Sequence, residues 1–204
     1  MRRALIVAAL PLFLAACGAE SVYAPEEQVQ AAVYRDAGPT SLTLFTMINN
    51  RSDGGAHTGL MVSGSQRVIF DPAGSWWHSL APERNDVHFG MTPKMLEFYI
   101  DYHARETYRV EMMTVEVSPE VAELALQLVQ AEGAVPKAMC ANATSSILRQ
   151  LPGFEQVPQT WFPNKIRDAF GKIPGVETQV IRQDGDSDDN SGILIAQQRV
   201  QVLR

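Results

Sequence analysis

The chain has 204 residues, which is enough for one domain of ordinary size. Its formal net charge of -6 at pH 7 and the lack of a basic stretch argue against nucleic acid as a partner. Beyond the first residues, no apolar run approaches the roughly 20 residues that a membrane-spanning helix needs.

The N-terminal residues have the composition of a secretion signal. A basic start, an apolar run over 4–14 and two small residues precede Cys17. The sequence Leu14-Ala15-Ala16-Cys17 resembles the lipobox of bacterial lipoproteins. The resemblance implies that residues 1–16 are a signal peptide that is removed, that the Cys17 sulfur receives diacylglycerol, and that the new amine is acylated. An ordinary secretion signal followed by a chance cysteine is the alternative interpretation.

Lipid attachment at Cys17 would determine where the protein is found. Several acyl chains on one residue hold a soluble domain at a membrane almost permanently. We therefore expect a lipid-anchored protein of the cell envelope that faces the periplasm. Gly18, rather than Asp, follows the cysteine, which by the sorting rule of some bacteria favours the outer membrane. Residues 17–39, polar and rich in Ala, are interpreted as the lipidated cysteine and a tether, and 40–204 as a single domain.

The first half of the domain is expected to be mostly strands. Segments rich in β-forming residues and bounded by turn residues predict strands over 41–48, 57–62 and 67–71. A long loop is expected over 72–90, where Trp76-Trp77 could line a substrate groove or cover the core. Thr92-Pro93 then predicts a helix to about His103, because Thr caps helices and Pro suits the first helical position.

The second half mixes strands with helices. Alternation predicts a strand over 108–117, and Ser118-Pro119 predicts a helix that ends at Gly133. The remaining expected elements are helices after Cys140 and around Lys165, an acidic loop over 183–191 and a terminal strand over 193–203. Strands first and interleaved helices later indicate an α+β fold.

Cys140 is the first residue type that suggests chemistry. Because lipid would occupy Cys17, Cys140 has no disulfide partner in the chain, and an unpaired thiol in an exported protein is a candidate reactive group. Its place at a helix start exposes the sulfur to backbone N–H groups and to the positive end of the helix dipole, which favour the thiolate. The alternative is an inert, buried cysteine that serves as a small apolar residue.

His57 and Asp71 are the candidate partners of this thiol. His57 begins one expected strand and Asp71 ends the next. A histidine at a strand edge can present one ring nitrogen to a thiol while a polar group holds the other nitrogen. Asp71 is the first candidate for that polar group, and His78 and His88 in the long loop are alternatives. His103 is expected to have a structural role.

The hairpin and the Cys140 helix together carry a family resemblance. His57-Thr-Gly-Leu-Met-Val, a turn and Arg67-Val-Ile-Phe-Asp71 are followed far downstream by Cys140-Ala-Asn-Ala-Thr-Ser-Ser-Ile-Leu. This order resembles the circularly permuted NlpC/P60 proteins, which include lecithin:retinol acyltransferase-like proteins, over residues 55–153. The resemblance implies a papain-like antiparallel sheet with packed helices, Cys140 as nucleophile and His57 as general base. Ala138-Met139 departs from the family, which often has Asn or Asp before the cysteine.

Other candidate sites are weaker. The acidic residues Asp184, Asp186, Asp188 and Asp189 alternate as calcium ligands do. An EF-hand would also need Gly and Glu at its sixth and twelfth positions, where Asp189 and Ile195 stand, so a solvated loop is the preferred interpretation. The sequence has no H-E-x-x-H motif and no Gly-rich phosphate loop, and we expect neither a metal nor a cofactor.

The sequence therefore predicts a membrane-tethered thiol hydrolase or acyltransferase that cleaves an amide or ester through a thioester on Cys140. A peptidoglycan peptide or an acyl lipid is the expected substrate, because an envelope anchor brings the domain to both. The competing prediction is a non-catalytic envelope lipoprotein that uses the same fold for binding or a structural role.

Overall fold

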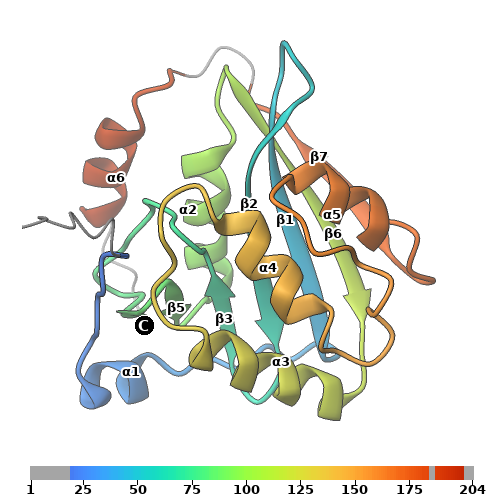
Figure 1. Cartoon of the computed structure of the whole chain (residues 1–204). Helices are drawn as coiled ribbons and strands as arrows, with labels where there is room; N and C mark the ends of the chain where they lie inside the picture. Colours follow the sequence, from blue (N-terminus) through green and yellow to red (C-terminus); the bar gives the residue numbers. More distant parts are fainter. Residues whose placement is uncertain (1–18, 184–186, 200–204) are drawn as a thin grey trace, which may run out of the picture.

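The computed structural model describes residues 19–183 and 187–199. In this part of the chain, a seven-stranded sheet lies between two layers of helices, and all its neighbouring strands are antiparallel (Figure 1). The α+β class expected from the sequence is therefore confirmed, whereas the papain-like arrangement stays a prediction.

The strands lie in the spatial order β4-β5-β3-β2-β1-β6-β7. Their bounds are β1 Ser41–Asn49, β2 Gly55–Ser63, β3 Arg67–Phe70, β4 Glu83–Arg84, β5 Val87–Phe89, β6 Tyr108–Glu116 and β7 Glu177–Ile181. The helices are α1 Glu26–Ala32, α2 Pro93–His103, α3 Pro119–Ala131, α4 Cys140–Leu148, α5 Pro163–Phe170 and α6 Asn190–Gln198.

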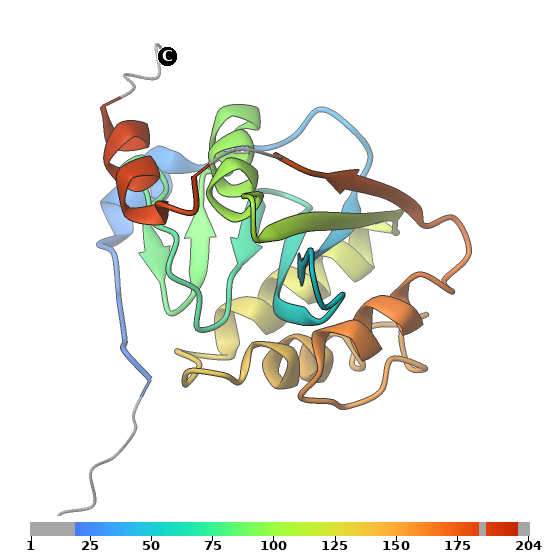
Figure 2. The same ribbon diagram turned by 90° about the horizontal axis from the view of Figure 1, so that it is seen from above.

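Alternation along the strands sends side chains into two separate cores. In β1, Leu42 and Leu44 belong to the core that α3, α4 and α5 cover, whereas Phe45 and Met47 belong to the core that α2 covers. Figure 2 looks along the sheet and shows α2 and α6 on one side of it and α3, α4 and α5 on the other. The sheet therefore separates the two helical layers, and residues of the two layers can come into contact only where a strand ends.

The predicted helix starts are confirmed. Thr92 and Ser118 precede the prolines that open α2 and α3, and each side-chain oxygen accepts a hydrogen bond from a backbone N–H of the first turn. Cys140 is the first residue of α4, as expected. The loop expected over 72–90 contains the two short strands β4 and β5.

The C-terminal region differs from the expectation. The terminal strand expected over 193–203 is wrong where the structure describes it, because 190–198 form α6. A short apolar run suits either a strand or a helix by composition, and here Asp189 caps the helix while Ile193 and Leu194 pack against the core under α2. The unexpected strand β7 is mostly exposed, so its sequence lacks the alternation that marks a half-buried strand.

Residues 17–39 are interpreted from the sequence as a tether, but the described part of this segment is attached to the edge of the sheet. Ala24 makes a backbone hydrogen bond to Glu83 of β4, and Val22 makes one to Asn85, which follows β4, each at 2.8 Å. Val29 of α1 is buried in the core. Residues 1–16, predicted to be a signal peptide, and Cys17 lie outside the described residues. Among the described helices, none has the length and apolarity needed to cross a membrane.

Candidate active site

The candidate site forms where β3 ends beside β2. Pairing between these strands runs from Ser63 to Leu60 of β2, whereas β1 continues along β2 as far as Gly55. The start of β2 is therefore bordered by a strand on one side only. In this stretch, the backbone N–H of Thr58 donates a hydrogen bond to the sulfur of Cys140. Cys140 begins α4, which belongs to the helical layer formed with α3 and α5.

A β-bulge precedes the histidine of the site. Met47 of β1 pairs with His57, but the next residue, Ile48, pairs with Gly55, which leaves Ala56 as an extra residue in β2. A bulge twists a strand locally and redirects the neighbouring side chain. Here it lies next to the one residue of the strand that is proposed to act chemically.

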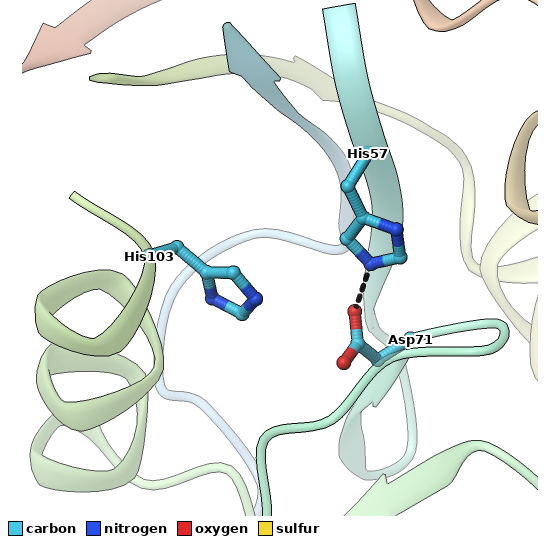
Figure 3. A group of neighbouring side chains, drawn as sticks. All are labelled: His57, Asp71 and His103. Carbon is cyan, nitrogen blue, oxygen red and sulfur yellow. Dashed lines mark hydrogen bonds and ion pairs between the residues drawn. The ribbon is translucent and has the colours of Figure 1, made fainter. Parts of the chain in front are cut away.

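His57 is hydrogen-bonded to a buried carboxylate. Its Nε2 atom lies 2.7 Å from Asp71 Oδ1, and Asp71 is 1% exposed (Figure 3). Tyr99, from α2, donates its hydroxyl to the same oxygen at 2.7 Å. Asp71 is thus the hydrogen-bond partner of His57, the first of the candidates that the sequence offers.

The electrostatics of this pair favour a protonated imidazole. Burial alone would lower the pKa of His57, but the charge of Asp71, their hydrogen bond and the Cys140 thiol together raise it from 6.5 to about 10. Burial opposes ionisation of Asp71 as well, yet the charge and hydrogen bond of His57 hold the pKa of Asp71 well below its usual range. The two residues therefore form an ion pair.

Cys140 is 8% exposed and hydrogen-bonded to His57. Burial would raise the pKa of the thiol. The hydrogen bond and charge of His57, with the backbone N–H groups of Thr58 and Ala141, outweigh burial and lower it. Because Nε2 of His57 is engaged by Asp71, Nδ1 is the ring nitrogen that remains for the sulfur.

The start of α4 can stabilise negative charge on more than the sulfur. The first backbone N–H groups of a helix have no partner within the helix. Met139, which precedes α4, supplies no side-chain cap. Donors of this kind stabilise an oxyanion that develops beside a nucleophile, as well as the thiolate itself.

His103 lies near this pair, with its Nδ1 atom 2.8 Å from the backbone oxygen of Tyr99, and the three residues together could hold a metal ion. The ligand atoms of His57, Asp71 and His103 lie within 4.8 Å of one another, which is close enough to hold an ion (Figure 3). However, His57 Nε2 and Asp71 Oδ1 are already bonded to each other, and Tyr99 occupies the same oxygen. A metal would have to break the contact that orients His57, so the set fits a hydrogen-bond network better than a metal centre.

The other histidine candidates do not contact His57 by hydrogen bonds. His78 Nε2 lies 3.1 Å from the backbone oxygen of Gln197, in the α6 region. His88 is buried in β5, with its ring against Trp76. Both predicted alternatives to Asp71 therefore have other places in the fold.

The Trp pair and the acidic loop also have definite positions. Trp76 is 2% exposed and belongs to the core, whereas Trp77 is 52% exposed. Asp188 accepts hydrogen bonds from Thr107, and Asp189 caps α6. Asp184 and Asp186 lie outside the described residues.

Two cavities flank the loop after Asp71. A cavity of about 350 Å³ is lined by His57, His103 and residues 73–75. A larger groove of about 1010 Å³ is also lined by 73–75, and by 135–137, which lead toward Cys140. The shared loop is thus the wall between the groove and the cavity at the histidine.

Comparison of the chain with protein-family models, curated proteins and solved structures gives no significant match. The resemblance to permuted NlpC/P60 proteins therefore stays a prediction.

Sequence reasoning missed several members of the site. Tyr99 and His103 were not assigned to it, although their four-residue spacing on α2 puts them on one helix face. That spacing was the available signal. The N–H groups of Thr58 and Ala141 belong to the main chain, and no residue type indicates them.

Proposed function

We propose that the protein is a lipid-anchored thiol hydrolase or acyltransferase of the cell envelope. The observation that carries the proposal is the alignment of Cys140, His57 and Asp71 at the start of α4. Nucleophilic catalysis by cysteine needs a thiol, a base in hydrogen-bond contact and a group that orients the base. The arrangement supplies all three, and the lowered pKa of Cys140 favours the reactive thiolate.

The proposed reaction begins with attack of the Cys140 thiolate on a carbonyl carbon. A C–S bond forms, and the carbonyl oxygen becomes an oxyanion beside the N–H groups at the start of α4. Collapse of this intermediate breaks the C–N or C–O bond, and the leaving amine or alcohol takes a proton from the His57 imidazolium. The product at this stage is a thioester on Cys140.

The second half of the reaction regenerates the enzyme. Neutral His57 accepts a proton from water or from an acceptor amine, which attacks the thioester carbon. The C–S bond then breaks, and Cys140 leaves as the thiolate beside the restored imidazolium. Peptidoglycan peptides and acyl lipids are the proposed substrates, because an envelope anchor gives access to both.

Alkylation of the native protein tests the activation of Cys140. Iodoacetamide should modify Cys140 at pH values well below the usual thiol pKa of about 8.5. The Cys140→Ser variant should show no such modification, and the urea-unfolded protein should react with an ordinary pH profile. An inert Cys140 in the native fold, or the same profile before and after unfolding, would falsify the catalytic proposal.

Mass spectrometry tests the thioester itself. Incubation with a p-nitrophenyl acyl ester, and separately with peptidoglycan fragments, should add an acyl mass to Cys140 that hydroxylamine removes. If Cys140 is activated but no substrate of either class acylates it, the competing function as a binding protein is favoured.

A further inference from the structure

The polypeptide between the proposed anchor and the domain is very short. The Ser21 hydroxyl donates to Asn85 Oδ1 at 2.8 Å, and backbone hydrogen bonds of Val22 and Ala24 follow immediately. The Tyr23 ring lies under the Arg84 guanidinium, with 4.5 Å between the ring centroid and Cζ. The chain is therefore attached to the sheet edge from Ser21 onward.

This attachment limits the distance between the domain and a membrane. Four residue steps separate Cys17 from Ser21, and a fully extended chain spans about 14 Å over that length. If Cys17 is lipidated, as the proposed function assumes, the domain cannot move far from the bilayer surface. The face of the domain nearest to Ser21 must then lie toward the lipid.

That face carries exposed apolar side chains. Val22, Tyr23 and Trp77 are 42%, 68% and 52% exposed, and we call them the anchor-side patch. Val22, Tyr23 and Trp77 line the groove of about 1010 Å³. Trp and Tyr are the side chains that concentrate at membrane–water interfaces, where an apolar ring and a polar group are both satisfied.

We propose that the anchor-side patch rests in the interfacial layer of the bilayer that holds Cys17, so that the adjoining groove opens at the membrane surface. The charged residues that line the groove are Glu20, Glu83, Asp86 and Lys137. With more acidic than basic groups, this face gains nothing from anionic lipids. Contact with the bilayer depends on burial of apolar rings, and salt does not release it.

The orientation has a consequence for the substrate. The groove and the cavity at His57 are separated only by the loop at 73–75. A molecule that enters the groove from the bilayer surface is thus separated by one loop from the cavity at His57, the proposed general base. The proposal deepens the proposed function, because it makes the membrane surface the place where substrate is collected.

Tryptophan fluorescence in vesicles tests the orientation. The lipidated full chain is reconstituted into vesicles of phosphatidylethanolamine and phosphatidylglycerol that carry bromine atoms on their acyl chains, which quench nearby indoles. The described residues include one buried tryptophan, Trp76, and two exposed ones, Trp77 and Trp161. Trp161 precedes α5, which lies away from the N-terminal segment in both views (Figure 1, Figure 2).

The two exposed tryptophans give matched variants. Trp77→Phe should lose more than half of the quenching, whereas Trp161→Phe should keep nearly all of it, and high salt should change neither. Greater loss in Trp161→Phe, or equal loss in the two variants, overturns the proposed orientation. The variants must show the far-ultraviolet circular dichroism of the wild type.

The Tyr23→Ser variant gives a second test. In vesicles, it should raise the accessibility of Trp77 to the aqueous quencher iodide, because it removes an apolar ring from the anchor-side patch.

Two controls separate this inference from the proposed function. Flotation with the vesicles reports the lipid anchor, so protein that does not float refutes both the anchor and the orientation. Alkylation of Cys140 in the same samples reports the catalytic proposal independently. A floating, alkylated protein whose Trp77 is not quenched refutes the orientation alone.

Discussion

His57 and Tyr99 donate hydrogen bonds to the same oxygen atom, Asp71 Oδ1, each at 2.7 Å. One donor comes from a strand and the other from a helix on the face of the sheet away from α4. Both bonds hold the same carboxylate oxygen, and the position of this oxygen orients the His57 ring. Part of the site's geometry therefore depends on a tyrosine whose hydroxyl is bonded to Asp71, the partner of His57.

Removal of the Tyr99 hydroxyl should destabilise the protein. A hydrogen bond to a charged group contributes about 1.5–3 kcal/mol, so Tyr99→Phe should lower the free energy of unfolding in urea by about 2 kcal/mol. Tyr102→Phe is the matched control, because the Tyr102 hydroxyl meets the neutral hydroxyl of Ser75 at 2.9 Å. A larger loss in the control than in Tyr99→Phe would contradict the role assigned to Tyr99.

Neutralising Asp71 should weaken the activation of Cys140. In Asp71→Asn, the pKa of His57 loses the charge of Asp71, the largest effect that raises it, and keeps burial, which lowers it, and the smaller effect of Cys140. The His57 imidazole is then less often charged, and its charge lowers the pKa of the thiol less. The alkylation profile of Cys140 should therefore move to higher pH, with a fall of about tenfold at neutral pH for each unit of the shift. Asp188→Asn, at a carboxylate bonded to Thr107, should leave the profile in place.

His103 should make the protein less stable in mild acid. Burial is the main reason that the folded protein holds the pKa of His103 at about 4, whereas an unfolded histidine has a value near 6.5. The unfolded state therefore binds the extra proton first. The stabilising effect is fully present above pH 6.5 and is lost as the pH falls toward 4, by up to about 3 kcal/mol.

The His103→Gln variant isolates this effect. Urea unfolding between pH 4 and 7 should show a smaller dependence on pH in the variant than in the wild type. Some dependence should remain, because burial also lowers the pKa values of His78 and His88. Identical slopes for the two proteins would show that His103 is not held neutral.

In the loop after Asp71, substitution of Gly74 should be far more damaging than substitution of Ala73. A Cβ atom at Gly74 would lie 1.8 Å from Asp71 Oδ2 and 2.9 Å from the Asp71 backbone oxygen. Gly74→Ala should therefore displace the carboxylate, lower the free energy of unfolding by about 2–3 kcal/mol and shift Cys140 alkylation to higher pH. Ala73→Gly is the control, because Ala73 has a φ of 58° that glycine adopts freely, and its stability should change by less than about 1 kcal/mol.

The sequence was most informative where a residue type has one strong local preference. Thr92, Ser118 and their prolines marked two helix starts, and the β-forming runs marked β1, β2 and β3. Cys140, His57 and Asp71 could be selected from residue type and expected position. Their proximity depends on the length of β3, which pairs with β2 only as far as Leu60 and leaves the residues from Gly55 to Gly59 without a neighbour on that side. No local sequence pattern encodes this difference in strand length.

Elements stabilised by distant contacts were predicted less well. The run at 193–195 suits a strand as well as a helix until α2 offers a surface for it. The segment before residue 39 was polar enough to be interpreted as a tether, yet its backbone bonds to the region of β4 and its Val29 side chain reaches the core. These contacts join parts of the chain far apart in sequence, which composition does not reveal.

The N-terminal segment also affects how the folded protein behaves toward other copies of itself. An uncovered edge strand offers unpaired N–H and C=O groups to any passing chain and promotes aggregation. Residues 22–24 occupy the outer side of β4 through the bridge between Tyr23 and Arg84 and the two backbone bonds beside it. The same few residues that would restrict the reach of the proposed anchor thus cap one end of the sheet, and a chain that begins at Pro25 should leave that edge open to self-association.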